Sequence, residues 1–183
     1  LSFKIDRGEC FGLLGTNGAG KSTTISVLTG LFHPTSGTAT IAGFDLLAHM
    51  SSIYTTMGVC PQFDILWPEL TVREHMLFYC RLKGVLTVDE QAAAVGAASA
   101  VGLADKLDAR VHTLSGGQKR RVSLGIALVG EPSVVFLDEP TTGLDPETRR
   151  TMWQLIEQSK AGRVIVLTTH SMDEADALCG RIG

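Results

Sequence analysis

The sequence lacks any pair of cysteines or histidines at the short spacing of a zinc site or a redox motif. No apolar run approaches the ~18 residues needed to cross a bilayer, and the start LSFKIDRGE has neither the basic nor the apolar region of a signal peptide. Scattered cysteines argue against a disulfide framework and are typical of reduced, mostly buried thiols in a cytosolic environment. The four cysteines are Cys10, Cys60, Cys80 and Cys179.

The sequence also lacks a strong excess of charge of one sign. Sixteen basic and 19 acidic residues give a net charge of −3, so nothing draws the chain as a whole to nucleic acid. The basic run Lys119–Arg121 is therefore predicted to be a solvated helix face. Hydrophobic residues make up 44% of the 183, which indicates a folded domain. Because the start resembles a strand entered midway and the end ALCGRIG hands a helix over to a strand, we expect a fragment of a longer protein.

The apolar pattern predicts an α/β fold with a mainly parallel sheet flanked by helices. Those runs that start at residues 10, 133 and 163 are nearly continuously apolar, as in strands buried on both faces. Helix starts are marked by a capping box at Thr71, by Asp145 before a proline, and by a second capping box of Ser171 with Glu174. The expected strands are residues 10–15, 38–43, 57–61, 133–138 and 163–169.

Residues 65–114 are different, because they are helical in pattern throughout and contain no convincing strand. We expect a single domain over 1–183 with a core of about 1–64 and 115–183. A helical subdomain of about 65–130 is inserted in it and overlaps the helix that begins at residue 115.

A glycine-rich loop directly after the first strand predicts a phosphate site. The stretch GTNGAGKST fits the pattern G-x-x-x-x-G-K-[ST] of a P-loop. Its glycines let successive N–H groups point at an anion, and the following helix adds its positive dipole end. Lys21 can reach the β- and γ-phosphates, and Ser22 can bind Mg²⁺. The residues expected to bind ATP are Gly15, Thr16, Asn17, Gly18, Ala19, Gly20, Lys21, Ser22 and Thr23.

Polar residues follow three further strands, where ligands of parallel sheets bind. Asp138 ends the run SVVFLD and is predicted to bind Mg²⁺, and Glu139 is the candidate base that polarises the attacking water. His170 follows the run VIVLTT and is a candidate γ-phosphate sensor. Gln62 follows the strand at 57–61, and its amide is predicted to contact Mg²⁺ or the water. Lys21, Gln62, Glu139 and His170 are the predicted catalytic set.

A second helix start, TLSGGQKRR, carries two glycines where helix formers are expected. Ser115 and Gln118 fit a capping box, so the helix end is well formed. Without side chains at Gly116 and Gly117, an anion can reach the backbone N–H groups. The sequence therefore predicts two helix N-termini suited to phosphate.

Together these motifs resemble the nucleotide-binding domain of ABC (ATP-binding cassette) transporters. GTNGAGKST resembles the Walker A loop of this family and VVFLDEP the Walker B strand, while Gln62 falls at the Q-loop and His170 at the switch histidine. The ABC signature is matched by Leu114, Ser115, Gly116, Gly117 and Gln118, and the D-loop by Gly143, Leu144 and Asp145. A finer resemblance, carried by ECFGLLGTNGAGKST and GVCPQFDILWPELTVREHMLFYCRLKG, is to the subfamily A lipid exporters.

The resemblance implies ATP and Mg²⁺ as cofactors and a second nucleotide-binding domain, whose signature faces this chain's ATP head to tail. It also implies transmembrane domains as partners, a place on the cytoplasmic face of a membrane protein, and ATP-driven export of a lipid or another hydrophobic substrate. No nucleic-acid partner is expected. Phe3 and Phe11 do not match the family's adenine-stacking aromatic residue. The alternatives are a soluble ABC-type ATPase of ribosomes or nucleic acid, a bacterial drug-export ATPase subunit, and a domain that only binds nucleotide.

Overall fold

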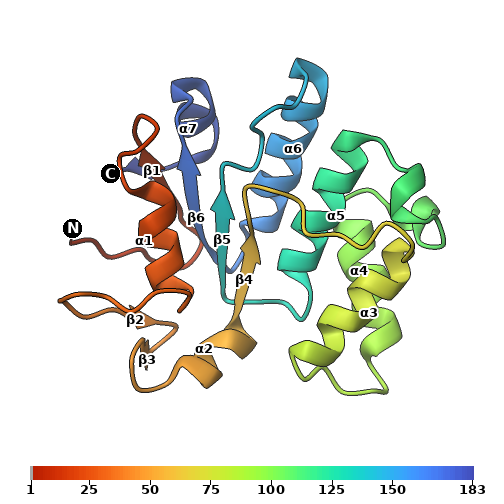
Figure 1. Cartoon of the computed structure of the whole chain (residues 1–183), viewed down its shortest axis with the longest axis horizontal. Helices are drawn as coiled ribbons and strands as arrows, with labels where there is room; N and C mark the ends of the chain where they lie inside the picture. Colours follow the sequence, from red (N-terminus) through yellow and green to blue (C-terminus); the bar gives the residue numbers. More distant parts are fainter. Residues whose placement is uncertain (1) are drawn as a thin grey trace.

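A five-stranded sheet, parallel throughout, forms the centre of the chain in a computed structural model that describes residues 2–183. The strand order is β4-β5-β6-β1-β7, so the first strand of the sequence lies inside the sheet (Figure 1). This agrees with the predicted mainly parallel α/β architecture. The strands are β1 (Cys10–Leu14), β4 (Met57–Cys60), β5 (Val134–Asp138), β6 (Val164–Thr169) and β7 (Arg181–Ile182).

Within the described residues, seven α-helices connect and cover these strands. They are α1 (Lys21–Leu28), α2 (Met50–Thr56), α3 (Val72–Leu82), α4 (Glu90–Ala100), α5 (Gly116–Leu128), α6 (Pro146–Ser159) and α7 (Met172–Leu178). Two 3₁₀ turns, η1 (Ala104–Lys106) and η2 (Val111–Thr113), precede α5, and a small antiparallel hairpin of β2 (Thr40–Ile41) and β3 (Phe44–Asp45) follows α1.

Each face of the sheet has its own hydrophobic core, because side chains alternate along a strand. In β5, Val134 and Phe136 pack with residues of α1, α2 and the hairpin, whereas Val135 and Leu137 pack with residues of α3 to α7. Burial on both faces explains the continuous apolar runs of the sequence.

Helices α3, α4 and α5 lie together beside the β4 edge of the sheet, at the right of Figure 1. The capping box of Thr71 and Glu74 starts α3 as predicted. Close packing of α5 against β4 depends on Gly58, because a Cβ there would lie 1.8 Å from the carbonyl oxygen of Ala127. Within residues 2–183, none of the helices has the length and apolar character required to cross a membrane.

Three local predictions were inaccurate. The strand expected at 38–43 is shortened to β2, because a turn at Ala42 and Gly43 ends it and leads into β3. Residues 2–6 form no strand, although LSFKID alternates (its first residue lies outside the described range). Ser171 accepts a hydrogen bond from the Glu174 amide, but no reciprocal capping bond forms. The Glu174 carboxylate is buried and accepts instead from Thr141 and Trp153, 2.6 and 3.1 Å away.

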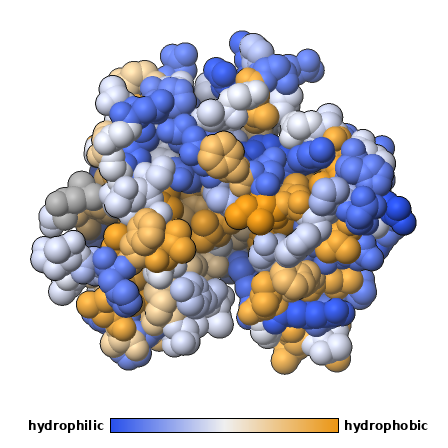
Figure 2. Space-filling view, viewed as in Figure 1, coloured by the Kyte–Doolittle hydropathy of each residue, from blue (hydrophilic) through white to orange (hydrophobic). Residues whose placement is uncertain are grey.

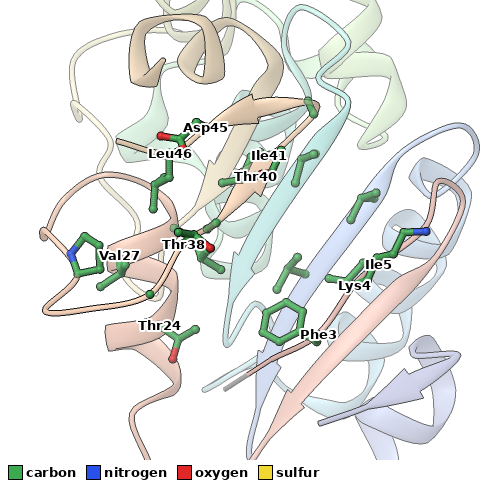
Figure 3. A pocket seen from close by; sticks show the side chains of 18 of the residues that line it. Phe3, Lys4, Ile5, Thr24, Val27, Thr38, Thr40, Ile41, Asp45 and Leu46 are labelled. Atoms are coloured by element: carbon green, nitrogen blue, oxygen red, sulfur yellow. The ribbon is translucent and has the colours of Figure 1, made fainter. Parts of the chain in front are cut away.

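A cavity of about 1180 Å³ separates α1 and the hairpin from part of the sheet. Figure 3 shows Val27, Ile41 and Leu46 on one side of it and Phe3 and Ile5 on the other. Its lining includes neither the loop of residues 15–22 nor the acidic end of β5. Thr23, the last residue of the set predicted to bind ATP, also lines the cavity, so the cavity adjoins the predicted phosphate site.

Candidate active site

The sheet topology places the predicted site residues together at the carboxyl-terminal ends of the strands. β4, β5, β6 and β1 are neighbours and parallel, so their carboxyl ends lie side by side. The loop of residues 15–20 follows β1, Gln62 follows β4, Glu139 follows β5 and His170 follows β6. These four segments are far apart in the sequence, and the parallel register alone brings them together.

The glycine-rich loop has the backbone that the sequence predicts. Gly18 and Gly20 have φ angles of 84° and 93°, in the left-handed region that favours glycine. No side chain caps the start of α1, so the amides of its first turn are available to an anion. The buried Lys21 Nζ donates to the carbonyl oxygens of Gly15 and Thr16, at 2.8 and 3.1 Å. Other predicted ATP contacts in the loop and helix start are solvent-exposed: Thr16, Asn17, Gly18, Ala19, Ser22 and Thr23.

The buried carboxylate of Glu139 is the point on which the predicted catalytic residues converge. Its Oε1 lies 3.6 Å from Lys21 Nζ, and its Oε2 lies 3.2 Å from Nδ1 of His170. Oε2 also accepts hydrogen bonds from Thr142 Oγ1 at 3.0 Å and from Gln62 Nε2 at 3.4 Å. One acidic side chain therefore contacts residues from all the other loops at this edge.

Asp138 and Glu139 serve different parts of the site, although they are adjacent. Asp138 Oδ1 accepts a hydrogen bond from Ser22 Oγ at 3.1 Å and another from Thr168. Glu139 has a φ angle of 44°, a left-handed conformation that non-glycine residues adopt at an energetic cost. Its amide is held by the backbone and the side chain of Thr168, at 3.1 and 3.0 Å. The two carboxylates therefore contact different residues, Asp138 with Ser22 and Glu139 with Lys21 and His170.

The chemistry of the donor set fits a magnesium ion bound jointly with a phosphate. Ser22 and Asp138 offer a hydroxyl and a carboxylate oxygen that are already in contact. In the part of the chain that is described, no three His, Cys, Asp or Glu side chains cluster as a dedicated metal cage. Mg²⁺ is commonly held by one or two protein oxygens together with substrate phosphates, which agrees with this arrangement.

The second glycine-bearing helix start has the predicted capping box. Ser115 Oγ accepts from the Gln118 amide at 3.2 Å, and Gln118 Oε1 accepts from the Ser115 amide at 2.9 Å. Ser115 and Gly116 are exposed, whereas Leu114 is buried in the core. Across residues 2–183, no hydrogen bond or ion pair joins residues 114–118 to the loop of residues 15–23. The two glycine-rich helix starts are therefore separate features of the chain.

The two glycines of this helix start have different environments. A Cβ at Gly116 would have no neighbour within 4 Å, whereas one at Gly117 would lie 2.5 Å from Cγ2 of Thr148 in α6. The sequence explains both glycines by the access of an anion to the backbone. The structure adds a second reason for Gly117, which is its close packing against Thr148.

Thr148 also belongs to the capping structure of α6, which begins after Gly143 and Leu144. Its hydroxyl donates to Asp145 Oδ2 at 2.6 Å, and its amide donates to Asp145 Oδ1 at 3.0 Å. These hydrogen bonds lower the pKa of Asp145 below its usual value and keep the cap ionised. The start of α5 is thus packed directly on the first turn of α6.

Alanine substitutions at the two glycines are expected to have opposite effects on stability. Gly116→Ala gains helix propensity, up to about 1 kcal/mol, at no steric cost. Gly117→Ala places a methyl group against Thr148 and is expected to destabilise the chain by about 1–2 kcal/mol, as in other overpacked sites. Urea unfolding of both variants measures the difference. Thr148→Ser, which removes the crowded methyl, is the control and should restore Gly117→Ala. Equal stability of the two alanine variants would contradict the packing role.

One buried residue beside the site was mispredicted from the sequence. Lys119–Arg121 was predicted to be a solvated face, but Arg120 is only 4% exposed and donates hydrogen bonds to segments on either side of the site. A signal was present, because Arg120 lies four residues before the buried Leu124 and thus on the core side of the helix. Charge alone was an insufficient guide.

Comparison with known proteins gives consistent matches. The family model described as ABC transporter matches residues 1–142. Over its whole length, this chain is 50% identical to ABC transporter A family member 12 and 51% identical to ABC transporter A family member 8, both from Arabidopsis thaliana. The chain spans only 20% of the length of each of these relatives.

A solved structure supports the same assignment. Its description is "Structure of ATP binding subunit of ABC transporter", and it superposes with a TM-score of 0.82 at 31% identity. The match covers 97% of this chain and 74% of that one. Sequence and fold therefore point to one group of proteins.

Proposed function

Because the chain belongs to the ABC transporter family and is the domain that binds and hydrolyses ATP, we propose that it powers export of a lipid or another hydrophobic substrate across a membrane. The observation that carries the proposal is the convergence of Lys21, Gln62 and His170 on the Glu139 carboxylate. Relatives named as A family transporters support the choice of subfamily. We assign residues 1–64 and 115–183 to the ATPase core and about 65–130 to a helical subdomain that overlaps it.

We infer that the loop of residues 15–23 binds the phosphates of ATP. The free amides at the start of α1 and the ammonium group of Lys21 supply positive charge on the same side of the loop. Magnesium would be held by Ser22 and Asp138, with Gln62 at its edge, and would neutralise charge on the phosphates. The protein's own contribution is to position the phosphates and to stabilise the charge of the transferred group.

Glu139 is the proposed base that orients and polarises the attacking water. Its carboxylate lies 3.6 Å from the lysine that would bind the β- and γ-phosphates, so it faces the end of the nucleotide where the bond breaks. His170 is half exposed and 3.2 Å away, in a position to contact the γ-phosphate. Gln62 and Thr142 hold the carboxylate by hydrogen bonds.

The exposed start of α5 is proposed to serve the ATP of a second nucleotide-binding domain. Ser115 and Gly116 face solvent and make no bond to the chain's own phosphate loop in the described residues. Their open backbone suits an anion presented by another molecule. Gly143, Leu144 and Asp145 precede the helix that packs on Gly117, so the D-loop and the signature would meet the partner together.

An exposed apolar surface supports docking to transmembrane domains. Figure 2 shows hydrophobic side chains gathered on the side of the molecule that carries α3 and the segment that precedes it. Large apolar residues in this region are 40–77% exposed, which is typical of an interaction surface. We propose that this surface meets the membrane domains from the cytoplasmic face. Its residues are Phe63, Ile65, Trp67, Phe78 and Leu82.

Removal of the Lys21 ammonium group tests the phosphate assignment. Lys21→Met keeps most of the side-chain volume and is expected to weaken equilibrium ATP binding about tenfold to a hundredfold, the usual cost of a charged hydrogen bond. Titration with a fluorescent ATP analogue measures the affinity. Lys106→Met, at a half-exposed lysine of η1, is the matched control and should bind as the unmodified protein does. Equal affinities of both variants would remove Lys21 from the phosphate site.

A further inference from the structure

Arg120 joins two segments at the active site, residues 138–140 and 61–64, through one guanidinium group. Nε donates to the carbonyl oxygen of Pro140 at 2.7 Å, and Nη2 donates to those of Asp138 and Glu139, both at 3.3 Å. Nη1 donates to the carbonyl oxygen of Pro61 at 2.6 Å and to Asp64 Oδ1 at 3.0 Å. Three consecutive carbonyls at the end of β5 and two groups that flank Gln62 thus share one side chain.

The surroundings make this contact network demanding. The Arg120 side chain is only 5% exposed, and a buried charge is tolerated only when it is fully partnered. Asp64 supplies the counter-charge. Its Oδ1 also accepts a hydrogen bond of 2.8 Å from Ser123 Oγ, which lies on α5 as Arg120 does. Burial also raises the pKa of the nearby Cys60 thiol to about 11, although the positive charge of Arg120 acts to lower it.

The contacts of Arg120 hold the backbone segments that carry the predicted base, Glu139, and its hydrogen-bond partner, Gln62. Glu139 adopts a left-handed conformation that is unfavourable without external support, and its carbonyl oxygen is one of the groups that Arg120 binds. Gln62, which donates to the Glu139 carboxylate, lies between Pro61 and Asp64, and Arg120 binds both. A planar guanidinium can hold this many acceptors in fixed directions, and an ammonium group cannot.

We propose that Arg120 is a positioning residue for ATP hydrolysis, which holds Glu139 and the segment of residues 61–64 in register with helix α5. The inference rests on the proposed role of Glu139 as base. Arg120 lies two residues after Gln118, so the helix that presents the signature to a partner's ATP also sets the position of this chain's own carboxylate.

Arg120→Lys in the full-length transporter tests the proposal. Lysine keeps the positive charge but lacks the planar guanidinium group that binds several carbonyl oxygens in fixed directions. The Glu139 carboxylate therefore loses its fixed position. Because a displacement of about 1 Å can cost a reaction about a hundredfold, we expect kcat for ATP hydrolysis to fall about tenfold to a hundredfold. KM for ATP should change less than about threefold, since no phosphate contact is removed. The kcat values are calculated per folded molecule. A variant that is merely destabilised contains less folded protein, but each folded molecule would keep the kcat of the unmodified transporter.

Two further variants test the same contacts if Arg120→Lys folds poorly. Asp64→Asn keeps the shape of the acceptor but removes its charge and should lower kcat about threefold to tenfold, again with KM unchanged. Lys119→Gln removes a neighbouring positive charge that has no side-chain hydrogen bond or ion pair in the described structure, and it should leave kcat unchanged.

The outcomes separate this inference from the proposed function. Undiminished kcat in folded Arg120→Lys and in Asp64→Asn would overturn the positioning role while ATP hydrolysis and its dependence on Glu139 stand. Equal losses in Lys119→Gln would also overturn it, because they would indicate a general charge effect. If the unmodified transporter hydrolyses no ATP, or if Glu139→Gln retains turnover, the proposed function fails first.

Discussion

Glu139→Gln is expected to preserve ATP binding and to lower ATP turnover by at least about a hundredfold, the typical contribution of a positioned general base. Glutamine has the same shape but no carboxylate to polarise water. Its amide also removes the negative charge that faces Lys21 Nζ and His170 Nδ1, 3.6 and 3.2 Å away. Phosphate release by the full-length transporter and ATP affinity at equilibrium measure the two quantities separately.

Glu131→Gln is the matched control for this prediction. Glu131 has a left-handed φ angle of 50°, close to the 44° of Glu139, but it is exposed and precedes β5, whereas Glu139 follows that strand. The same chemical change in the same backbone conformation should leave turnover intact. Undiminished hydrolysis in Glu139→Gln would remove this residue from the role of base and leave the convergence of the four loops without a catalytic explanation.

Ser115→Arg should block ATP hydrolysis by the full-length transporter without weakening ATP binding to the chain that carries it. The expected loss is about a hundredfold or more, because an arginine would fill the open surface where Ser115 and Gly116 face solvent. Binding in the same chain should persist, since no hydrogen bond or ion pair in residues 2–183 links this helix start to the loop of residues 15–23. Paired measurements of turnover and of ATP affinity to the isolated domain check both halves of the prediction.

Ser99→Arg gives the control, because it places the same side chain on an exposed position of α4 and should leave hydrolysis unchanged. Lost ATP affinity in the isolated Ser115→Arg domain would argue against a role of this helix start toward a second molecule. The signature would then belong to the chain's own nucleotide site.

Features that depend on short stretches of sequence were predictable. The glycine-rich loop needs left-handed residues at fixed offsets, and Gly18 and Gly20 supply them. Capping boxes join residues three positions apart, so those at Thr71 and Ser115 could be recognised without a fold. The apolar runs of the inner strands follow from burial on both faces of a parallel sheet.

Features that depend on distant partners were misjudged or missed. Glu174 fits a capping box by spacing, yet its carboxylate is taken by Thr141 and Trp153, 33 and 21 positions away. Gly117 was explained by access to an anion, and its contact with Thr148 of another helix was not foreseen. In both cases the local pattern was correct and a tertiary contact determined what the residue does.

By itself the sequence determined the inner strands and most helices of the core and the backbone of the glycine-rich loop, because these are local properties of the chain. Only the tertiary structure decided that Glu139 is the residue on which the others converge, and that Arg120 is a buried clamp and not a solvated charge. Pro61 and Asp138 lie 59 and 18 positions from Arg120. Their carbonyls meet its guanidinium only because parallel strands end at one edge and α5 packs against it, which no local pattern encodes.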